Sequence, residues 1–179
     1  MSDAVVTVFG VGDLLTFRLR NRTGRLGLRR ATPATEWYER GLALEASEPA
    51  AALHAYERAI AGRPDFADAH NNLGRVHHDL RHLALAESHY RIAICFDQAV
   101  ALYHFNLGVV VEDQGRTAEA IGHYERALEL DPTLADAHYN LARQYELSAR
   151  RANDELLMRR AVRHLVQYRA LARSHAGQR

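Results

Sequence analysis

The sequence predicts an all-α fold, a right-handed solenoid of about four helix-turn-helix repeats with an extended C-terminal capping helix. The first observation is a repeat of 34 residues: segments 67–74, 101–108 and 135–142 share alanine at the start, histidine at the fourth place and Asn-Leu at the sixth and seventh. The second is the helical spacing of apolar and small residues around polar breaks such as 113–116. Because one helical hairpin cannot bury its apolar face alone, neighbouring copies must stack.

The repeats divide the chain into three parts. We expect an array over residues 34–172 with copies at 34–66, 67–100, 101–134 and 135–172, preceded by an N-terminal segment 1–33 and followed by a tail 173–179. The first copy fits only at a length of 33 residues, with Pro49 at the start of its second helix. In the last copy the second-helix pattern, at 161–168, comes about seven residues late. We therefore expect an insertion at 150–160 to lengthen the final helix into an Arg-rich cap.

The N-terminal segment does not fit the repeat. Residues 5–9 and 14–20 have the composition of strands, and we expect them to form a short hairpin across 10–13. Residues 21–30 are rich in glycine and arginine, which predicts mobility. The segment as a whole is therefore expected to be basic and partly disordered or a short hairpin.

The repeat pattern resembles the tetratricopeptide repeat family. Small residues, Gly108 in a first helix and Ala120 in a second, let two backbones approach closely, and Tyr124 fills the space beside them. The best copy combines these with Leu107, Ala127 and Pro132 and departs from the family pattern at His104 and Val111, where aromatic residues are usual. The resemblance covers residues 34–172 and implies a helical scaffold for protein binding. We expect the protein to be bacterial.

Composition bounds the function further. The single cysteine, Cys95, excludes an intramolecular disulfide framework and a zinc site built from several cysteines, and we expect its side chain in the core beside Ile94 and Phe96. No stretch approaches the roughly 18 consecutive apolar residues that a membrane span needs. We therefore expect a cytoplasmic protein without a membrane span.

No pattern of an enzyme is present. The chain has 11 histidines, and His77, His78 and His82 have spacings that metal ligands can use, yet no catalytic or metal-binding motif accompanies them. His104 and its equivalents occupy one packing position of the repeat. We expect no catalytic residue, metal or cofactor, although an enzyme whose cleft recruits a metal at His78, Asp79, Glu112 and Asp113 is a distant alternative.

The resemblance implies that the first helices line a concave, peptide-binding face. The residues chosen for this face are Asn72, Asn106, Asn140, Arg75, Arg143, Phe105, Tyr139, Asp79, Glu112 and Asp113. The three asparagines place one amide in each repeat, which can pair with the backbone of an extended peptide. This ladder is similar to the asparagine ladder of O-linked N-acetylglucosamine transferases. The alternative is that each amide bonds a neighbouring helix.

The charge on this face predicts a cationic guest. The candidate positions hold eight carboxylates, at Glu39, Glu45, Asp68, Asp79, Glu112, Asp113, Asp136 and Glu146, against only Arg75 and Arg143. Phe105 and Tyr139 supply an apolar anchor. The basic residues that the family uses to clamp the carboxylates of chaperone tails are missing, so we expect no binding of such tails. The alternative is a solvated acidic surface without a ligand.

The leading prediction is a non-catalytic interaction module that binds an extended basic segment of another protein and scaffolds a complex. Net charges are +4 over residues 1–33, −8 over 34–132 and +5 over 133–179, which argues against a nucleic-acid surface in the middle of the chain. The basic stretch 18–30 is a second hypothetical guest, in cis or from another copy, and self-association through this segment or the end helix is a further hypothesis. The alternative function is a regulatory or dimerisation region similar to those of MerR-type transcription regulators.

Overall fold

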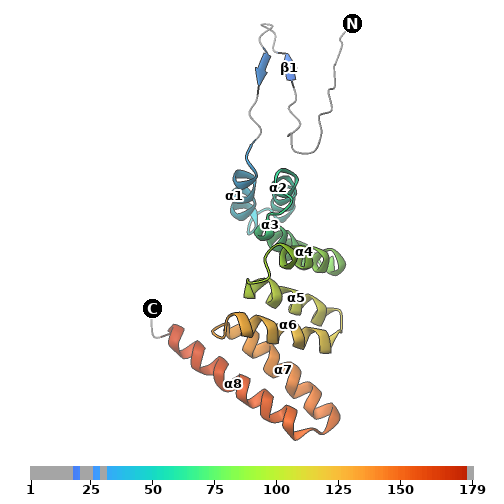
Figure 1. The fold of residues 1–179 in the computed structure, drawn as a ribbon, viewed down its shortest axis with the longest axis vertical. Helices are drawn as coiled ribbons and strands as arrows, with labels where there is room; N and C mark the ends of the chain where they lie inside the picture. Colours follow the sequence, from blue (N-terminus) through green and yellow to red (C-terminus); the bar gives the residue numbers. More distant parts are fainter. Residues whose placement is uncertain (1–17, 21–25, 29–31, 177–179) are drawn as a thin grey trace.

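The computed structural model describes residues 18–20, 26–28 and 32–176 and shows a stack of paired α-helices (Figure 1). The helices are α1 (Ala34–Leu44), α2 (Pro49–Gly62), α3 (Ala67–Asp79), α4 (Leu83–Phe96), α5 (Ala101–Asp113), α6 (Thr117–Leu130), α7 (Ala135–Ala152) and α8 (Glu155–Ala176). Each odd-numbered helix packs against the even-numbered helix that follows it, and each pair packs on the next. The prediction of an all-α solenoid of helix-turn-helix repeats is confirmed.

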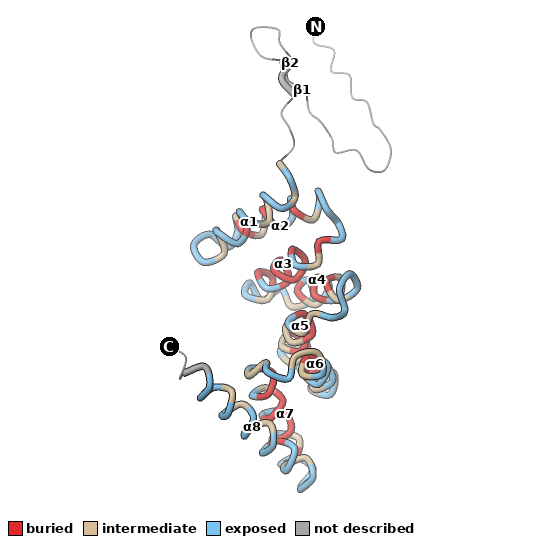
Figure 2. Tube along the Cα trace, turned by 60° about the vertical axis from the view of Figure 1, so that its left-hand side comes forward, coloured by how far each residue is buried: buried red, intermediate tan, exposed pale blue. Residues whose placement is uncertain are grey.

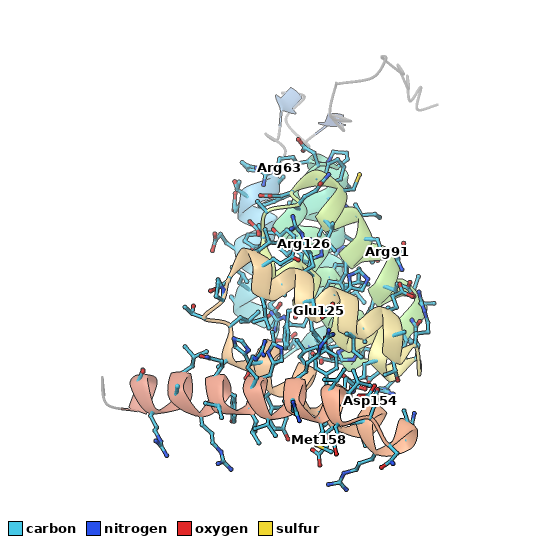
Figure 3. All side chains as sticks on the ribbon, turned by 60° about the horizontal axis from the view of Figure 1, so that its bottom comes forward. Arg63, Arg91, Glu125, Arg126, Asp154 and Met158 are labelled. Carbon is cyan, nitrogen blue, oxygen red and sulfur yellow. The ribbon has the colours of Figure 1, made fainter. Side chains whose placement is uncertain are left out.

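Tight turns join the helices of each pair. Gly115, with φ +80°, lies in the break between α5 and α6 in the left-handed region, and Arg81, with φ 62°, holds the equivalent place between α3 and α4. Asn153, with φ 52°, separates α7 from α8, and asparagine is among the few residues that tolerate this conformation. Asp154 then caps α8, because its carboxylate accepts the backbone N–H of Leu156 at 2.8 Å. Figure 3 labels Asp154 and Met158 in this region.

The core runs along the stack where helices face one another (Figure 2). Its largest fully buried side chains include Leu107 and Tyr124 and their equivalents in other repeats. The glycines of the first helices permit close approach: a Cβ atom added to Gly108 would lie 2.7 Å from Cε1 of Tyr124. These contacts fix the spacing between paired helices and hence the position of the surface formed by successive first helices.

The last repeat has the extended final helix that we expected, because α8 has 22 residues where α6 has 14. The first helix of this repeat is also longer: α7 has 18 residues where α5 has 13. Both helices of the pair therefore take up the added residues, and α8 continues to Ala176, beyond the expected boundary at residue 172.

Two other expectations changed with the structure. Strand β1 (Arg18–Arg20) pairs antiparallel with β2 (Leu26–Leu28), so the pairing partner lies in the stretch 21–30 that we expected to be mobile. Residues 5–9, expected to pair with 14–20, fall outside the described part, as does most of the basic stretch 18–30.

The expectation that Cys95 is a core residue is wrong: its side chain is exposed, because the buried face of α4 carries Ala86, Tyr90 and Ala93. None of the described helices is long and apolar enough to cross a membrane.

Candidate functional site

The ten predicted site residues lie on α3, α5 and α7, on a surface where successive first helices contact one another. Cross-helix contacts from Arg75 to Glu45, from Asn106 to Asn71 and from Arg143 to Glu112 join α1, α3, α5 and α7. We call this surface the first-helix face. Of the candidates, Arg75, Asp79, Asp113, Tyr139 and Arg143 are exposed, whereas Phe105, Asn106, Glu112 and Asn140 are half-buried and Asn72 is buried.

The three asparagines are engaged by the scaffold. The amide nitrogen of Asn72 donates to the Tyr38 hydroxyl at 3.1 Å, and its oxygen accepts from Asn71 at 3.1 Å. The amide nitrogen of Asn106 donates to Asn71 at 2.9 Å, and that of Asn140 makes a longer contact, 3.4 Å, to the hydroxyl of Tyr124. The three amide nitrogens thus bond neighbouring helices, as the alternative to a peptide-binding ladder expects.

Two amide oxygens remain available on this face. Within the described part of the chain, Oδ1 of Asn106 and Oδ1 of Asn140 have no hydrogen-bond partner, and both side chains are half-buried rather than closed off. An amide oxygen accepts hydrogen bonds from backbone or side-chain N–H groups. What the ladder offers a guest is thus two acceptors, from α5 and α7, rather than three complete amides.

Both predicted arginines are paired with carboxylates. Glu45 accepts a hydrogen bond from the Tyr56 hydroxyl at 2.6 Å and forms an ion pair with Arg75. Two repeats on, Glu112 accepts from the Tyr124 hydroxyl at 2.8 Å and pairs with Arg143. Burial, together with the acceptor Glu45, raises the pKa of Tyr56, so this hydroxyl stays protonated and donates. The same Tyr-Glu-Arg arrangement therefore occurs twice along the face.

Ion pairing leaves the face less acidic than its composition indicates. Asp113 accepts from His78 at 2.9 Å and from Arg81 at 2.6 Å. Burial opposes its ionisation, but these hydrogen bonds outweigh burial and lower the pKa of Asp113. Among the described residues, the carboxylates on this face that form no ion pair are Glu39, Asp68, Asp79 and Asp136, half of the predicted eight.

Apolar side chains are exposed between these carboxylates. Leu102 on α5 and Tyr139 and Leu147 on α7 are 47%, 46% and 44% exposed. Phe105 is partly covered by Tyr124, with ring centres 5.8 Å apart. Exposed apolar side chains that gather on one face, with charge around them, are typical of binding surfaces.

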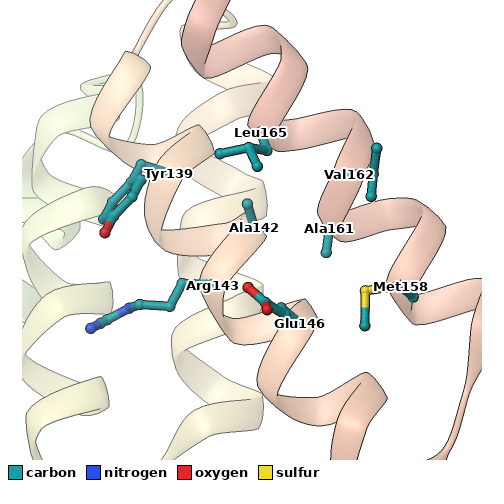
Figure 4. A pocket seen from close by; sticks show the side chains of 8 residues that line it. All are labelled: Tyr139, Ala142, Arg143, Glu146, Met158, Ala161, Val162 and Leu165. Carbon is teal, nitrogen blue, oxygen red and sulfur yellow. The ribbon is translucent and has the colours of Figure 1, made fainter.

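Sequence reasoning missed a pocket at the α7–α8 end of this face. A hollow of about 250 Å³ is lined by Tyr139, Ala142, Arg143, Glu146, Met158, Ala161, Val162 and Leu165 (Figure 4). The signal was present in the sequence, because Leu165 stands where earlier repeats have tyrosine.

The histidines do not assemble a metal site in the described ranges. No three His, Cys, Asp or Glu side chains there are grouped as ligands for a metal ion. His77 packs beside His82 and stacks on His89, whereas His78 points to Asp113, so the three histidines noted in the sequence do not converge.

Comparison with known proteins gives the following matches. A family model described as TPR repeat matches residues 112–147, and one described as tetratricopeptide repeat matches residues 41–100. No curated protein matches the sequence significantly. A crystal structure of MamA is similar, with 19% identity, 80% of this chain and 81% of that chain covered and a TM-score of 0.70.

Two further solved structures have the same fold. MamA from residue 41 to its end, from Desulfovibrio magneticus RS-1, has 21% identity over 79% of this chain and 76% of that chain, with a TM-score of 0.66. The first TPR of Spaghetti (RPAP3), bound to the HSP90 peptide SRMEEVD, has 22% identity over 65% of this chain and 93% of that chain, with a TM-score of 0.63. At these identities the similarity establishes the fold.

Proposed function

The chain belongs to the tetratricopeptide repeat family, and on this basis we propose that it is a non-catalytic protein-interaction module. Its first-helix face binds an extended segment of a partner protein that carries apolar and basic side chains, and so holds that partner in a complex. The observation that carries this proposal is the group of exposed apolar side chains Leu102, Tyr139 and Leu147, on two successive first helices and bordered by carboxylates.

The apolar group supplies the affinity in this account. Removing apolar area from water contributes roughly 25 cal/mol per Å², and aromatic side chains dominate the binding energy of many interfaces. Tyr139 is 46% exposed and packs on Tyr168, with ring centres 5.2 Å apart, so its ring is held in place before a guest arrives. A prepositioned ring loses little conformational entropy on binding.

Polar groups on the first-helix face orient the guest and favour one that is positively charged. Oδ1 of Asn106 and Oδ1 of Asn140 accept N–H groups of an extended backbone. Asp79 and Asp136, which form no ion pair in the described part, attract lysine or arginine side chains. Arg75 and Arg143 are neutralised by Glu45 and Glu112, so they do not favour an acidic guest.

A peptide selection tests the proposal. A random peptide library is selected on the immobilised protein, and enriched peptides are measured by isothermal titration. We expect enrichment of lysine or arginine together with aromatic or aliphatic residues. Leu102→Ala should weaken binding at least tenfold. The matched control is Leu85→Ala on α4, where the leucine is 51% exposed on a second helix.

Two results would contradict the proposal. One is enrichment of acidic peptides, which would assign the opposite charge preference. The other is equal affinity for the wild type and Leu102→Ala combined with a loss in Leu85→Ala, which would move the binding surface to the second helices.

A further inference from the structure

A tyrosine of the second helix fills the same space in each of the first three repeats. Tyr56, Tyr90 and Tyr124 are buried, and each lies against a glycine of its partner helix. A Cβ atom on Gly41 would lie 2.4 Å from Tyr56, and one on Gly74 would lie 2.9 Å from Tyr90. The ring therefore takes the volume that the missing side chain releases.

In the first and third repeats, this tyrosine completes a defined set of contacts. Its ring packs against an aromatic residue of the first helix at 5.8 Å between centres, on Tyr38 for Tyr56 and on Phe105 for Tyr124. Its hydroxyl donates to a glutamate at the C-terminal end of the first helix, Glu45 just after α1 or Glu112 in the last turn of α5. An arginine binds the other oxygen of that glutamate.

The fourth repeat keeps the aromatic residue and the glutamate of this set, at Tyr139 and Glu146, but lacks the tyrosine. Ala142 takes the place of the glycine. The arginine differs in origin: Arg75 and Arg143 come from the first helix of the next repeat, whereas Arg150 lies four residues after Glu146 on α7 and donates to its Oε1 at 2.5 Å. At the tyrosine position stands Leu165, which has neither a ring nor a hydroxyl group.

The pocket of about 250 Å³ lies in this place, and Tyr139, Ala142, Glu146 and Leu165 are among its lining residues (Figure 4). Met158 and Val162 of α8 complete its apolar wall. Oε2 of Glu146 has no hydrogen-bond partner among residues 32–176. The site thus combines an apolar wall, an aromatic neighbour and one free carboxylate oxygen.

We propose that this pocket receives a tyrosine side chain of the partner protein, with its ring against Tyr139 and Leu165 and its hydroxyl donating to Glu146. The inference rests on the proposed function and names the anchor residue of the guest. The pocket is smaller than the roughly 300–1,000 Å³ typical of sites for drug-sized ligands, which suits a single aromatic ring. The other repeats of this chain supply the template for the contact.

The segment 1–33 cannot supply this tyrosine. All eight tyrosines of the sequence lie within α1 to α8, and the segment 1–33, although rich in arginine, contains none. A basic segment of this chain folding back over the face would therefore lack the hydroxyphenyl group that the pocket fits. Among the scaffold tyrosines, Tyr139 is an exposed one, and it already forms part of the wall.

The test uses p-cresol, the side-chain analogue of tyrosine, and toluene, the analogue of phenylalanine. Each is titrated into the full chain and followed by amide NMR shifts. We expect saturable shifts in α7 and α8 with a dissociation constant on the order of millimolar for p-cresol. Toluene should bind about tenfold more weakly, because a hydrogen bond to a charged acceptor is lost. Glu146→Ala should remove this preference, while Arg150→Ala should retain it.

A filled-pocket variant locates the binding. In Ala142→Gly/Leu165→Tyr, the chain supplies its own glycine and tyrosine, as it does in the first three repeats. We expect this double variant to keep its circular dichroism spectrum and melting temperature and to lose p-cresol binding. Ala142→Gly alone should keep the binding, which controls for the change at residue 142.

Several outcomes would overturn the inference. These are no saturable p-cresol shift in the wild type, equal binding of toluene, or unchanged binding in the folded double variant. Peptides selected on the first-helix face that still bind in such a case would leave the proposed function standing. Sedimentation that shows a dimer dissociated by the double substitution would assign the pocket to a second copy instead of a partner protein.

Discussion

Two partly buried histidine pairs are the most distinctive feature at the scale of single residues. Nε2 of His70 lies 3.0 Å from the Pro64 carbonyl, so it carries the proton and donates; Nδ1 of His70 therefore accepts from Nδ1 of His89, 3.2 Å away. His138 makes the same contacts to Pro132, at 3.1 Å, and to His164, at 2.9 Å. With both rings neutral, the two Nδ1 atoms of each pair form a hydrogen bond, because one donates and the other accepts. If both rings were doubly protonated, two N–H groups would face each other and this hydrogen bond could not form.

The pairs predict a loss of stability in mild acid. Burial, followed by the neighbouring charges of His70 and His77, lowers the pKa of His89 to about 4, whereas an unfolded histidine titrates near 6.5. The unfolded chain binds more protons between these values, so the stabilising contribution is complete above about pH 6.5 and declines as the pH falls toward 4. We expect a lower melting temperature at pH 5 than at pH 7.

A substitution tests the origin of that loss. The side-chain amide of His89→Gln can donate to Nδ1 of His70 and does not titrate. Its melting temperature should fall less between pH 7 and pH 5 than that of the wild type. An equal fall in both proteins, measured by circular dichroism, would show that other groups govern the acid response.

Two glycine-to-alanine substitutions should change the stability of the fold in opposite directions. Gly108→Ala places a methyl group 2.7 Å from the Tyr124 ring, and overpacking of this kind costs about 1–3 kcal/mol. Nothing lies within 4 Å of a Cβ atom on Gly122, so Gly122→Ala should stabilise helix α6 by about 0.5–1 kcal/mol. Urea unfolding measures both changes. Similar free energies of unfolding for the two variants would contradict the close contact between Gly108 and Tyr124.

At the scale of helices, the sequence predicts the repeats well because each copy places similar residues at the same packing positions. The period of 34 places Leu107 and Tyr124 in the core without any knowledge of distant contacts. Asn72 and Asn106 show the limit of this reasoning. Whether an amide at such a position is free depends on the residue opposite it in the previous helix, and Tyr38 and Asn71 lie outside the repeat motif.

The last helix pair shows a second limit. The late pattern at 161–168 reveals that residues are inserted, but helical propensity is similar on both sides of the break. The position of the turn depends on Asn153 in the left-handed conformation and on the cap at Asp154. The same pair contains the α7–α8 pocket, because Leu165 replaces a tyrosine there.

We expect the first-helix face to discriminate between peptides by their charge. The peptide SRMEEVD, bound by the TPR structure from RPAP3, has adjacent glutamates and a C-terminal carboxylate. On this chain Arg75 and Arg143 are held by Glu45 and Glu112, and the unpaired carboxylates would repel such a peptide. We expect fluorescence anisotropy to detect no binding of SRMEEVD, while a library-selected basic peptide binds. Binding of SRMEEVD at micromolar concentration would contradict this charge assignment.

At the scale of the whole molecule, contacts run from each helix pair to the next, so stability is the sum of local units and their interfaces. One such interface between the second and third repeats is an ionic network: Arg116 binds Glu87 and Glu119, and Arg91 binds both of the same carboxylates. Side-by-side first helices give a continuous surface, on which a guest contacts several repeats at once. Binding therefore depends on the register between repeats as well as on individual side chains.

The central claim is that a partner segment lies along α3, α5 and α7. The most direct measurement is hydrogen–deuterium exchange of the full chain with and without the tightest library-selected peptide. The account predicts slower exchange in α5 and α7, with a smaller effect in α3, and unchanged exchange in α4 and α6. Protection confined to α4 and α6, with α5 and α7 unaffected, would contradict it.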